Sequence, residues 1–271
     1  MFECVLNVSE GRRLNQLDAL ALAAGSSLRD RHSDAIHNRS VFTLIDPPDE
    51  LRRHVHRFIV ATMKRLDLRE HEGVHPRFGV LDVVPYVALD PARSREAEML
   101  RDETAHWVAS TFDVPVFLYG HLADGTFRTL PEVRRDAFTS LPPDYGPPVA
   151  SEERGASALG ARGVLVAWNL WLRDVSLGEA RDVVRHLRQK EVRALAFQVG
   201  EHVQISCNLV EPLTVGPSFV YDKVTDLLRS GGIERAELVG LVPEKVLHHE
   251  DPARWAQLDL AEEKTIEARV A

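Results

Sequence analysis

The order of apolar stretches constrains the fold of this 271-residue chain more than any other feature. After Gly163, the apolar periodicity predicts strand, helix, strand, strand, helix and strand, the βαββαβ order of ferredoxin-like domains. The first ninety residues predict the same order. The expected strands lie at 2–8, 27–33, 39–46, 80–89, 114–119, 164–172, 192–199, 203–210 and 236–242, and the expected helices at 12–24, 48–66, 91–112, 131–138, 176–188 and 217–230.

This repeated order predicts an α/β (α+β) fold of two related ferredoxin-like halves, residues 1–162 and 163–271. Each half should be a sheet with helices on one face, and the halves should face each other across a substrate cleft. The stretch from about 120 to 162 is rich in Pro, Gly and Asp and is expected to be irregular apart from one short helix. A loop of that length indicates ligand contact or a connection between domains.

Composition excludes several functional classes. A hydrophobic fraction of 44% and a charged fraction of 27% are typical of soluble globular proteins. The formal charge of −8 repels polyanions, so we expect no nucleic-acid partner. The first residues do not have the pattern of a signal peptide, so we expect none, and no apolar run reaches membrane-spanning length. These observations favour a cytoplasmic protein with no membrane partner. The two cysteines, Cys4 and Cys207, lie in strand-like runs and are expected to be buried thiols of a reducing compartment.

Residues 71–77 (HEGVHPR) hold the densest group of reactive side chains. The segment matches H-E-x-x-H, a zinc signature that requires both histidines on one face of a helix. Gly73 interrupts such a helix, and Pro76 disfavours helical geometry at His75. We therefore expect no metal, and activity that survives dialysis against a strong chelator.

The same loop favours His75 as a general base, because Pro76 stiffens the backbone beside an imidazole that titrates near neutral pH. From the residues alone, a capping or surface role for His75 is equally compatible. Arg39, at the head of a strand, could bind a carboxylate with both guanidinium arms or form a surface salt bridge. His54 and His56 lie off the apolar face of their helix and are expected to be solvated.

Seven segments in order resemble the glutamate formiminotransferase family, which in mammals is the N-terminal part of formimidoyltransferase-cyclodeaminase. They are ECVLNVSEG (3–11), HNRSVF (37–42), HEGVHPRFGVLDVVPY (71–86), DVPVFLYG (113–120), RTLP (128–131), GASALGAR (155–162) and LVGLVPEK (238–245). The resemblance runs from residue 3 to about residue 250, and we expect the transferase activity alone, without a cyclodeaminase part. It implies transfer of a formimino group from N-formimino-L-glutamate to N5 of tetrahydrofolate, in one-carbon metabolism and histidine degradation, by a cytoplasmic homodimer.

The resemblance also implies roles for individual residues. The catalytic histidine of the family falls on His75, and Asn38, Arg39 and Arg77 become candidates to hold anionic substrate groups. Tetrahydrofolate is implied as co-substrate. The positions implied near folate or substrate are Gly146, Pro147, Gly155 and Arg162.

Two departures from the family pattern affect substrate identity. Where the family carries an aspartate near its catalytic histidine, this chain has His32, and Asp34 or Asp30 could supply the missing carboxylate. Residues 147–154 match the family poorly and include two glutamates. Two alternatives therefore stay open: a different donor such as a formyl compound, or a folate- or small-ligand-binding protein without catalysis.

Overall fold

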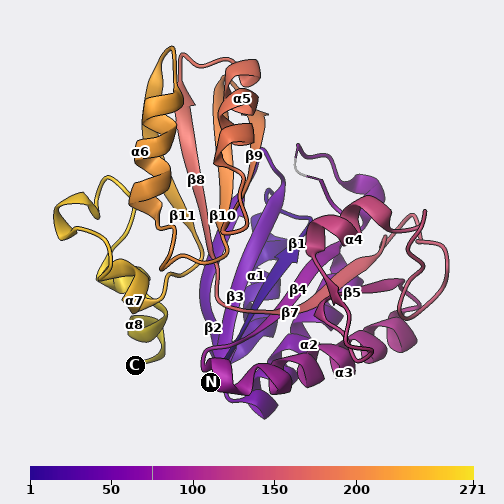
Figure 1. The fold of residues 1–271 in the computed structure, drawn as a ribbon. Helices are drawn as coiled ribbons and strands as arrows, with labels where there is room; N and C mark the ends of the chain where they lie inside the picture. Colours follow the sequence, from indigo (N-terminus) through magenta and orange to yellow (C-terminus); the bar gives the residue numbers. More distant parts are fainter. Residues whose placement is uncertain (75) are drawn as a thin grey trace. The chain divides into compact units, whose positions relative to one another are not determined.

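The computed structural model describes residues 1–74 and 76–271, which divide into two compact units, 1–163 and 164–271 (Figure 1). Each unit is described by itself. In the first, the elements are β1 (Phe2–Val8), α1 (Leu14–Ala24), β2 (Leu28–Asp34), β3 (Arg39–Asp46), α2 (Pro48–Arg65), β4 (Leu81–Ala88), α3 (Ser94–Phe112), β5 (Val116–His121), β6 (Phe127–Arg128), α4 (Leu130–Asp136) and β7 (Ser157–Arg162). In the second, they are β8 (Val166–Arg173), α5 (Leu177–Leu187), β9 (Val192–Val199), β10 (His202–Leu209), α6 (Pro217–Leu227), β11 (Gly232–Val239), α7 (Glu244–Leu247) and α8 (Ile266–Val270). Short 3₁₀ turns lie at Gly25–Ser27, Leu68–Glu70, Pro91–Arg93, Pro252–Arg254 and Glu262–Lys264.

Both units contain the predicted ferredoxin-like arrangement. In the first, βαββαβ connectivity gives the strand order β2-β3-β1-β4, and in the second it gives the corresponding order β9-β10-β8-β11. Within these two sets every neighbouring pair is antiparallel. The predicted α+β class and the repeated topology are therefore confirmed.

Helix α2 illustrates how local sequence fixes an element. Pro48 begins the helix, where a missing N–H costs nothing, and Asp49 and Glu50 lie in its first turn. Lys64 and Arg65 lie in the last turn, so both ends complement the helix dipole. Its inner face buries seven side chains, namely Leu51, His54, Val55, Phe58, Ile59, Thr62 and Met63.

Strand alternation separates the two faces of the larger sheet. Along β1, the side chains of Phe2, Cys4, Leu6 and Val8 belong to a core that also contains apolar residues of α1, α2 and α3. Along α1, Leu17 and Leu20 are buried, but Leu14 and Leu22 are 67% and 78% exposed. Cys4 and Cys207 are buried free thiols, as predicted, and burial raises the pKa of Cys207 to about 12.

The prediction that residues 120–162 are irregular apart from a short helix was wrong at Phe127–Arg128, which form β6 and pair with β5, and at its end. Residues 157–162 form β7, which lies between β4 and β5 and is parallel to both. The helix α4 also corrects the prediction that helices cover only one face. Its Val133 packs with Phe117 of β5 and Ala158 of β7, which alternate with the residues that face α1–α3.

Among residues 1–74 and 76–271, no helix combines the length and the apolar character needed to cross a bilayer.

His54 and His56 were wrongly expected to be solvated. His54 is buried against Ser27, and the His56 ring stacks on Trp107 with centroids 3.9 Å apart.

Candidate active site

Three loops meet at one end of the larger sheet, and Asn38 joins them. Asn38 lies in the turn between β2 and β3, and its Oδ1 accepts a hydrogen bond from the N–H of Gly11, in the loop after β1, at 2.8 Å. Its Nδ2 donates to the carbonyl of Glu72, in the loop before β4, at 3.0 Å. Asn38 has a φ of 48°, a left-handed conformation that asparagine tolerates better than most residues.

The loops approach each other backbone to backbone, which requires glycine at the contacts. A Cβ on Gly11 would lie 2.2 Å from the carbonyl oxygen of Asp34, and one on Gly73 would lie 2.3 Å from that of His37. Residue types with a side chain at either position would separate the loops. The glycines of the first and third loops therefore set the geometry of this junction.

The loop that precedes β4 is braced from both sides of His75. The Nε2 of His71 donates to the Asn38 carbonyl at 2.6 Å, and Arg77 donates to the carbonyls of His71 and Gly73 at 3.1 and 3.4 Å. Burial lowers the pKa of His71, which favours the neutral ring with its proton on Nε2. His75 itself, the expected general base, lies outside the described residues.

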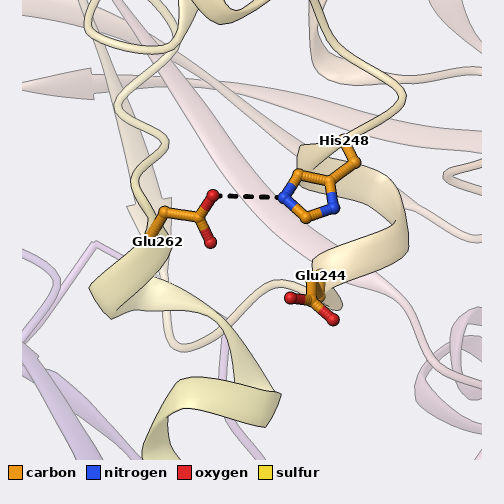
Figure 2. A group of neighbouring side chains, drawn as sticks. All are labelled: Glu244, His248 and Glu262. Carbon is orange, nitrogen blue, oxygen red and sulfur yellow. Dashed lines mark hydrogen bonds and ion pairs between the residues drawn. The ribbon is translucent and has the colours of Figure 1, made fainter.

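The zinc signature requires a helix, and the residues on either side of His75 do not form one. Neither 71–74 nor 76–80 is helical, as Gly73 and Pro76 predicted, and His71 uses its Nε2 on a backbone carbonyl. Among the described residues, one group of three potential metal ligands occurs elsewhere, in the second unit. Figure 2 shows this group, Glu244, His248 and Glu262, all exposed, with His248 Nε2 3.1 Å from a Glu262 carboxylate oxygen.

Glu10 organises the first of the three loops. Its carboxylate accepts hydrogen bonds from the N–H groups of Arg12 and Arg13 at 2.8 and 2.9 Å and pairs with the Arg13 guanidinium. Burial alone would raise the pKa of Glu10, but these hydrogen bonds and the arginine charge hold it below its ordinary value. Glu10 is therefore a structural anion that fixes the loop.

An ion pair between Asp82 and Arg134, which no sequence motif indicated, affects the pKa of Arg39. Arg39 Nη2 donates to Asn7 Oδ1 at 2.5 Å. Asp82 is 1% exposed; its Oδ1 accepts from the Phe78 N–H and its Oδ2 from Arg134 Nη2, both at 2.7 Å. Burial lowers the pKa of Arg39, the Asp82 charge opposes that effect and the Arg134 charge adds to it, which indicates that the three groups are electrostatic neighbours.

A signal for Asp82 was present in the sequence. It is an acidic residue in an otherwise apolar strand, and a buried carboxylate requires a partner. Its partner lies 52 positions away on α4, which no spacing rule could indicate.

The strand predicted at 27–33, which contains His32, is confirmed as β2. Asp30, His32 and Asp34 lie opposite Thr43, Val41 and Arg39 of β3, so all three share one face. Asp34 Oδ1 accepts hydrogen bonds from the N–H groups of Ile36 and His37 at 2.8 and 2.7 Å. The Asp34 carboxylate is therefore fixed within the turn that presents Asn38 and Arg39.

The remaining predicted residues fall at two different ends of the sheet. Gly155 forms a bridge to Gly79 beside the third loop, and Gly146 follows Tyr145, which bridges to the start of β5 at the same end. Both glycines have positive φ, 72° and 85°, and a Cβ on either would lie within 2.4 Å of a backbone carbonyl, so each serves a turn. Pro147, which follows Gly146, is half-buried.

Arg162 is separated from this group. It ends β7 opposite Val87 of β4, five residues along the strand from Asp82, which corresponds to about 16 Å. Its charge acts on Glu3 of β1, whose pKa is raised by burial and lowered in part by Arg162. The structure therefore does not bring Arg162 together with Arg39 and Arg77.

The fold and this junction define an α+β protein of two ferredoxin-like units with a buried, arginine-containing polar site at one end of the larger sheet. A family model described as "Formiminotransferase domain, N-terminal subdomain" matches residues 1–162. The chain belongs to the formiminotransferase family.

Relatives of known name support this membership over most of the chain. A glutamate formimidoyltransferase of Thermoplasma acidophilum is 32% identical over 91% of this chain and 89% of its own length. One from Streptococcus pyogenes serotype M1 is 29% identical over 90% of each chain. The formimidoyltransferase-cyclodeaminase of Gallus gallus is 29% identical over 91% of this chain, which spans about half (51%) of that protein.

Proposed function

We propose that this protein transfers a formimino group from N-formimino-L-glutamate to N5 of tetrahydrofolate. Family membership and the names of the two full-length relatives support formimino transfer with glutamate as the carrier. The observation that carries the proposal to particular residues is the three-loop junction. It braces the loop on both sides of His75 through contacts of Asn38, His71 and Arg77.

The proposed reaction needs one group that accepts and returns a proton. N5 of tetrahydrofolate attacks the formimino carbon, and His75 takes the proton that N5 loses. The bond between that carbon and the glutamate nitrogen then breaks, and His75 returns the proton to the departing amine. The products are 5-formiminotetrahydrofolate and L-glutamate, and the reaction requires no metal.

The charge of the donor constrains the residues near it. A formimino group is cationic at neutral pH and favours a nearby carboxylate. Two backbone hydrogen bonds hold Asp34 in place opposite Arg39 on the neighbouring strand, so Asp34 is a fixed negative charge where the family aspartate is replaced by His32. We assign Asp34 the role of that carboxylate.

Assays with two donors test the proposal. The purified protein is incubated with tetrahydrofolate and either N-formimino-L-glutamate or N-formyl-L-glutamate, and the folate product is followed by absorbance and mass spectrometry. Formimino transfer at least tenfold faster than formyl transfer is the expected result. Faster formyl transfer would identify the neutral donor as the substrate, and binding of tetrahydrofolate without turnover of either donor would identify a binding protein.

A further inference from the structure

A buried imidazole in the three-loop junction has one nitrogen without a hydrogen-bond partner. His71 begins the loop that contains His75, and it is 8% exposed. Its Nε2 donates to the Asn38 carbonyl at 2.6 Å. Its Nδ1 is shielded from solvent, and no donor among the residues that the structure describes makes a hydrogen bond to it. A buried polar atom without a hydrogen bond is unfavourable in a folded protein and therefore requires an explanation.

The contact with Asn38 decides which nitrogen of the ring carries the proton. A carbonyl oxygen accepts hydrogen bonds and donates none, so the proton of the neutral ring lies on Nε2. Burial lowers the pKa of His71, which keeps the ring neutral. Moving the proton to Nδ1 would place the lone pair of Nε2 against the carbonyl oxygen. The Nδ1 atom of His71 is therefore a fixed acceptor.

The surroundings of His71 hold its ring in place beside the surface of the loop. Arg77 Nη2 donates to the His71 carbonyl at 3.1 Å, which fixes the backbone that carries the ring. A Cβ on Gly73 would lie 3.0 Å from Cε1, the ring atom bonded to both nitrogens, so the Gly73 backbone lies beside this edge of the ring. Gly73 has no side chain and is partly exposed, and its neighbours Glu72 and Val74 are exposed. A thin, glycine-containing segment of the loop therefore lies over this edge of the ring.

Formimino and formyl donors differ at one atom that such an acceptor distinguishes. A formimino group ends in a nitrogen that offers N–H donors, whereas a formyl group ends in a carbonyl oxygen, which is an acceptor. An imidazole nitrogen with a fixed lone pair binds the N–H of the first and repels the oxygen of the second. A site that is built to bind a substrate N–H rejects an analogue without it more strongly than a pocket that selects by shape alone.

We infer that His71, through Nδ1, accepts a hydrogen bond from the formimino nitrogen of the donor and so selects formimino over formyl compounds. This inference rests on the proposed function, because that function supplies a donor with this group. It assigns His71 as a specificity-determining residue. Proton transfer stays with His75, and the counter-charge of the donor stays with Asp34.

A purely structural role for His71 in bracing the loop is the competing explanation, and two substitutions separate the two roles. In His71→Gln, the amide nitrogen replaces Nε2 as donor to the Asn38 carbonyl, but the acceptor at the position of Nδ1 is lost. In His71→Asn, the shorter side chain places an acceptor at the position of Nδ1 and does not reach that carbonyl. The exposed His249→Gln is the control for the change of residue type.

The experiment measures kcat/KM and the calorimetric Kd for N-formimino-L-glutamate and for N-formyl-L-glutamate, in the wild type and the three variants, with thermal melting for each. His71→Gln is expected to lower the preference for the formimino compound, in kcat/KM and in affinity, by about 10- to 100-fold, because one hydrogen bond to a charged group is lost. His71→Asn should lose activity with both donors but keep a preference within about threefold of the wild type, because its acceptor remains. His249→Gln should match the wild type.

A measurement on the wild type keeps the inference testable if a variant does not fold. In protein with isotope-labelled histidine nitrogens, NMR should show the Nδ1 of His71 as an unprotonated nitrogen. Its resonance should move upfield on saturation with N-formimino-L-glutamate, because a hydrogen bond to the lone pair forms, and should stay in place with N-formyl-L-glutamate.

The outcomes separate this inference from the proposed function. An unchanged preference in His71→Gln, or an equal loss of preference in His71→Gln and His71→Asn, would overturn the inference, as would an Nδ1 resonance that both donors move or neither moves. If the wild type transfers no formimino group, the proposed function fails, and the binding and NMR measurements decide the inference alone. A preference for binding the formimino compound that is lost in His71→Gln and kept in His71→Asn supports it, and a wild type without that preference refutes it.

Discussion

At the scale of single residues, the proposed chemistry depends on one imidazole. His75→Ala should lower kcat by about 10² to 10⁴, the usual contribution of a positioned general base. Thermal stability should change little, because loop positions seldom carry core packing. Steady-state assays and melting curves check this, with the exposed His249→Ala as the matched control. A His75→Ala variant that folds and keeps more than half its activity would rule out this base.

The neighbouring carboxylate gives a second prediction at this scale. Asp34→Asn should lower transfer from formiminoglutamate by about 10- to 100-fold, because the cationic donor loses a fixed counter-charge. The amide oxygen of the substituted side chain would still accept the hydrogen bonds from Ile36 and His37, so the turn should persist. His32→Asp should preserve or improve activity. An Asp34→Asn variant with unchanged formimino transfer would show that the donor needs no carboxylate here.

How much of the site the sequence could reveal depends on the range of each contact. The loop 71–77 and Arg39 could be singled out from the sequence because glycine, proline and arginine act through local chemistry at adjacent positions, whereas Asn38 was indicated by the family resemblance. The Asp82–Arg134 pair was not predictable, because it joins β4 to a helix on the opposite side of the sheet from α1–α3. Arg162 was predicted at the site by resemblance, yet strand pairing places it at the far end of β4.

At the scale of elements, the loop junction should be more sensitive than its few residues suggest. Gly73→Ala introduces a Cβ 2.3 Å from the His37 carbonyl oxygen, so the loop must shift. We expect a loss of activity of at least tenfold, because small displacements of a positioned catalytic group are costly, and a loss of stability of about 1 to 3 kcal/mol.

The control for this prediction is Gly178→Ala in the first turn of α5, where an added Cβ meets its nearest neighbour at 3.8 Å. That variant should keep full activity and gain a little stability from the better helix propensity of alanine. Urea unfolding and steady-state assays check both variants. Similar losses in the two would show that the contact at Gly73 is not what positions the loop.

Element prediction succeeded where periodicity was strong and failed where side chains were small. Helices α2, α3, α5 and α6 lie within a few residues of their predicted bounds because their apolar faces repeat over several turns. Strand β7, SALGAR, has little bulk and a glycine, so it resembles a loop in sequence. It is a strand because β4 and β5 pair with it on both sides, which is a tertiary effect.

At the scale of the whole molecule, each unit has its own apolar core against its own sheet, and the same strand order arises in both. What the halves share is the succession of period-2 and helical patterns, and that succession suffices to select the topology. The first unit extends the pattern by β7, β5 and β6. Its additional loops supply the polar site, while its core helices supply stability.

The core helices also predict how stability depends on pH. The His56 ring of α2 stacks on Trp107 of α3, and burial, with a smaller effect of Arg52, lowers its pKa from 6.5 to about 4 against the opposing charge of Glu103. The folded protein therefore keeps His56 neutral, whereas the unfolded chain takes up a proton below pH 6.5. Because the unfolded state binds more protons in this window, stability should fall as pH decreases from about 6.5 to about 4.

The variant His56→Phe keeps an aromatic ring against Trp107 and removes the titrating group. Urea unfolding between pH 7 and pH 4.5 should show a decline in the wild type that is smaller in the variant by about 1 to 3 kcal/mol. Part of the decline should remain, because burial also lowers the pKa of His54. The exposed His249→Gln serves as control and should follow the wild type. Parallel curves for His56→Phe and the wild type would show that His56 does not couple protonation to folding. The loss of stability at low pH would then come from His54 and from carboxylates such as Glu10, whose pKa is held low in the folded state.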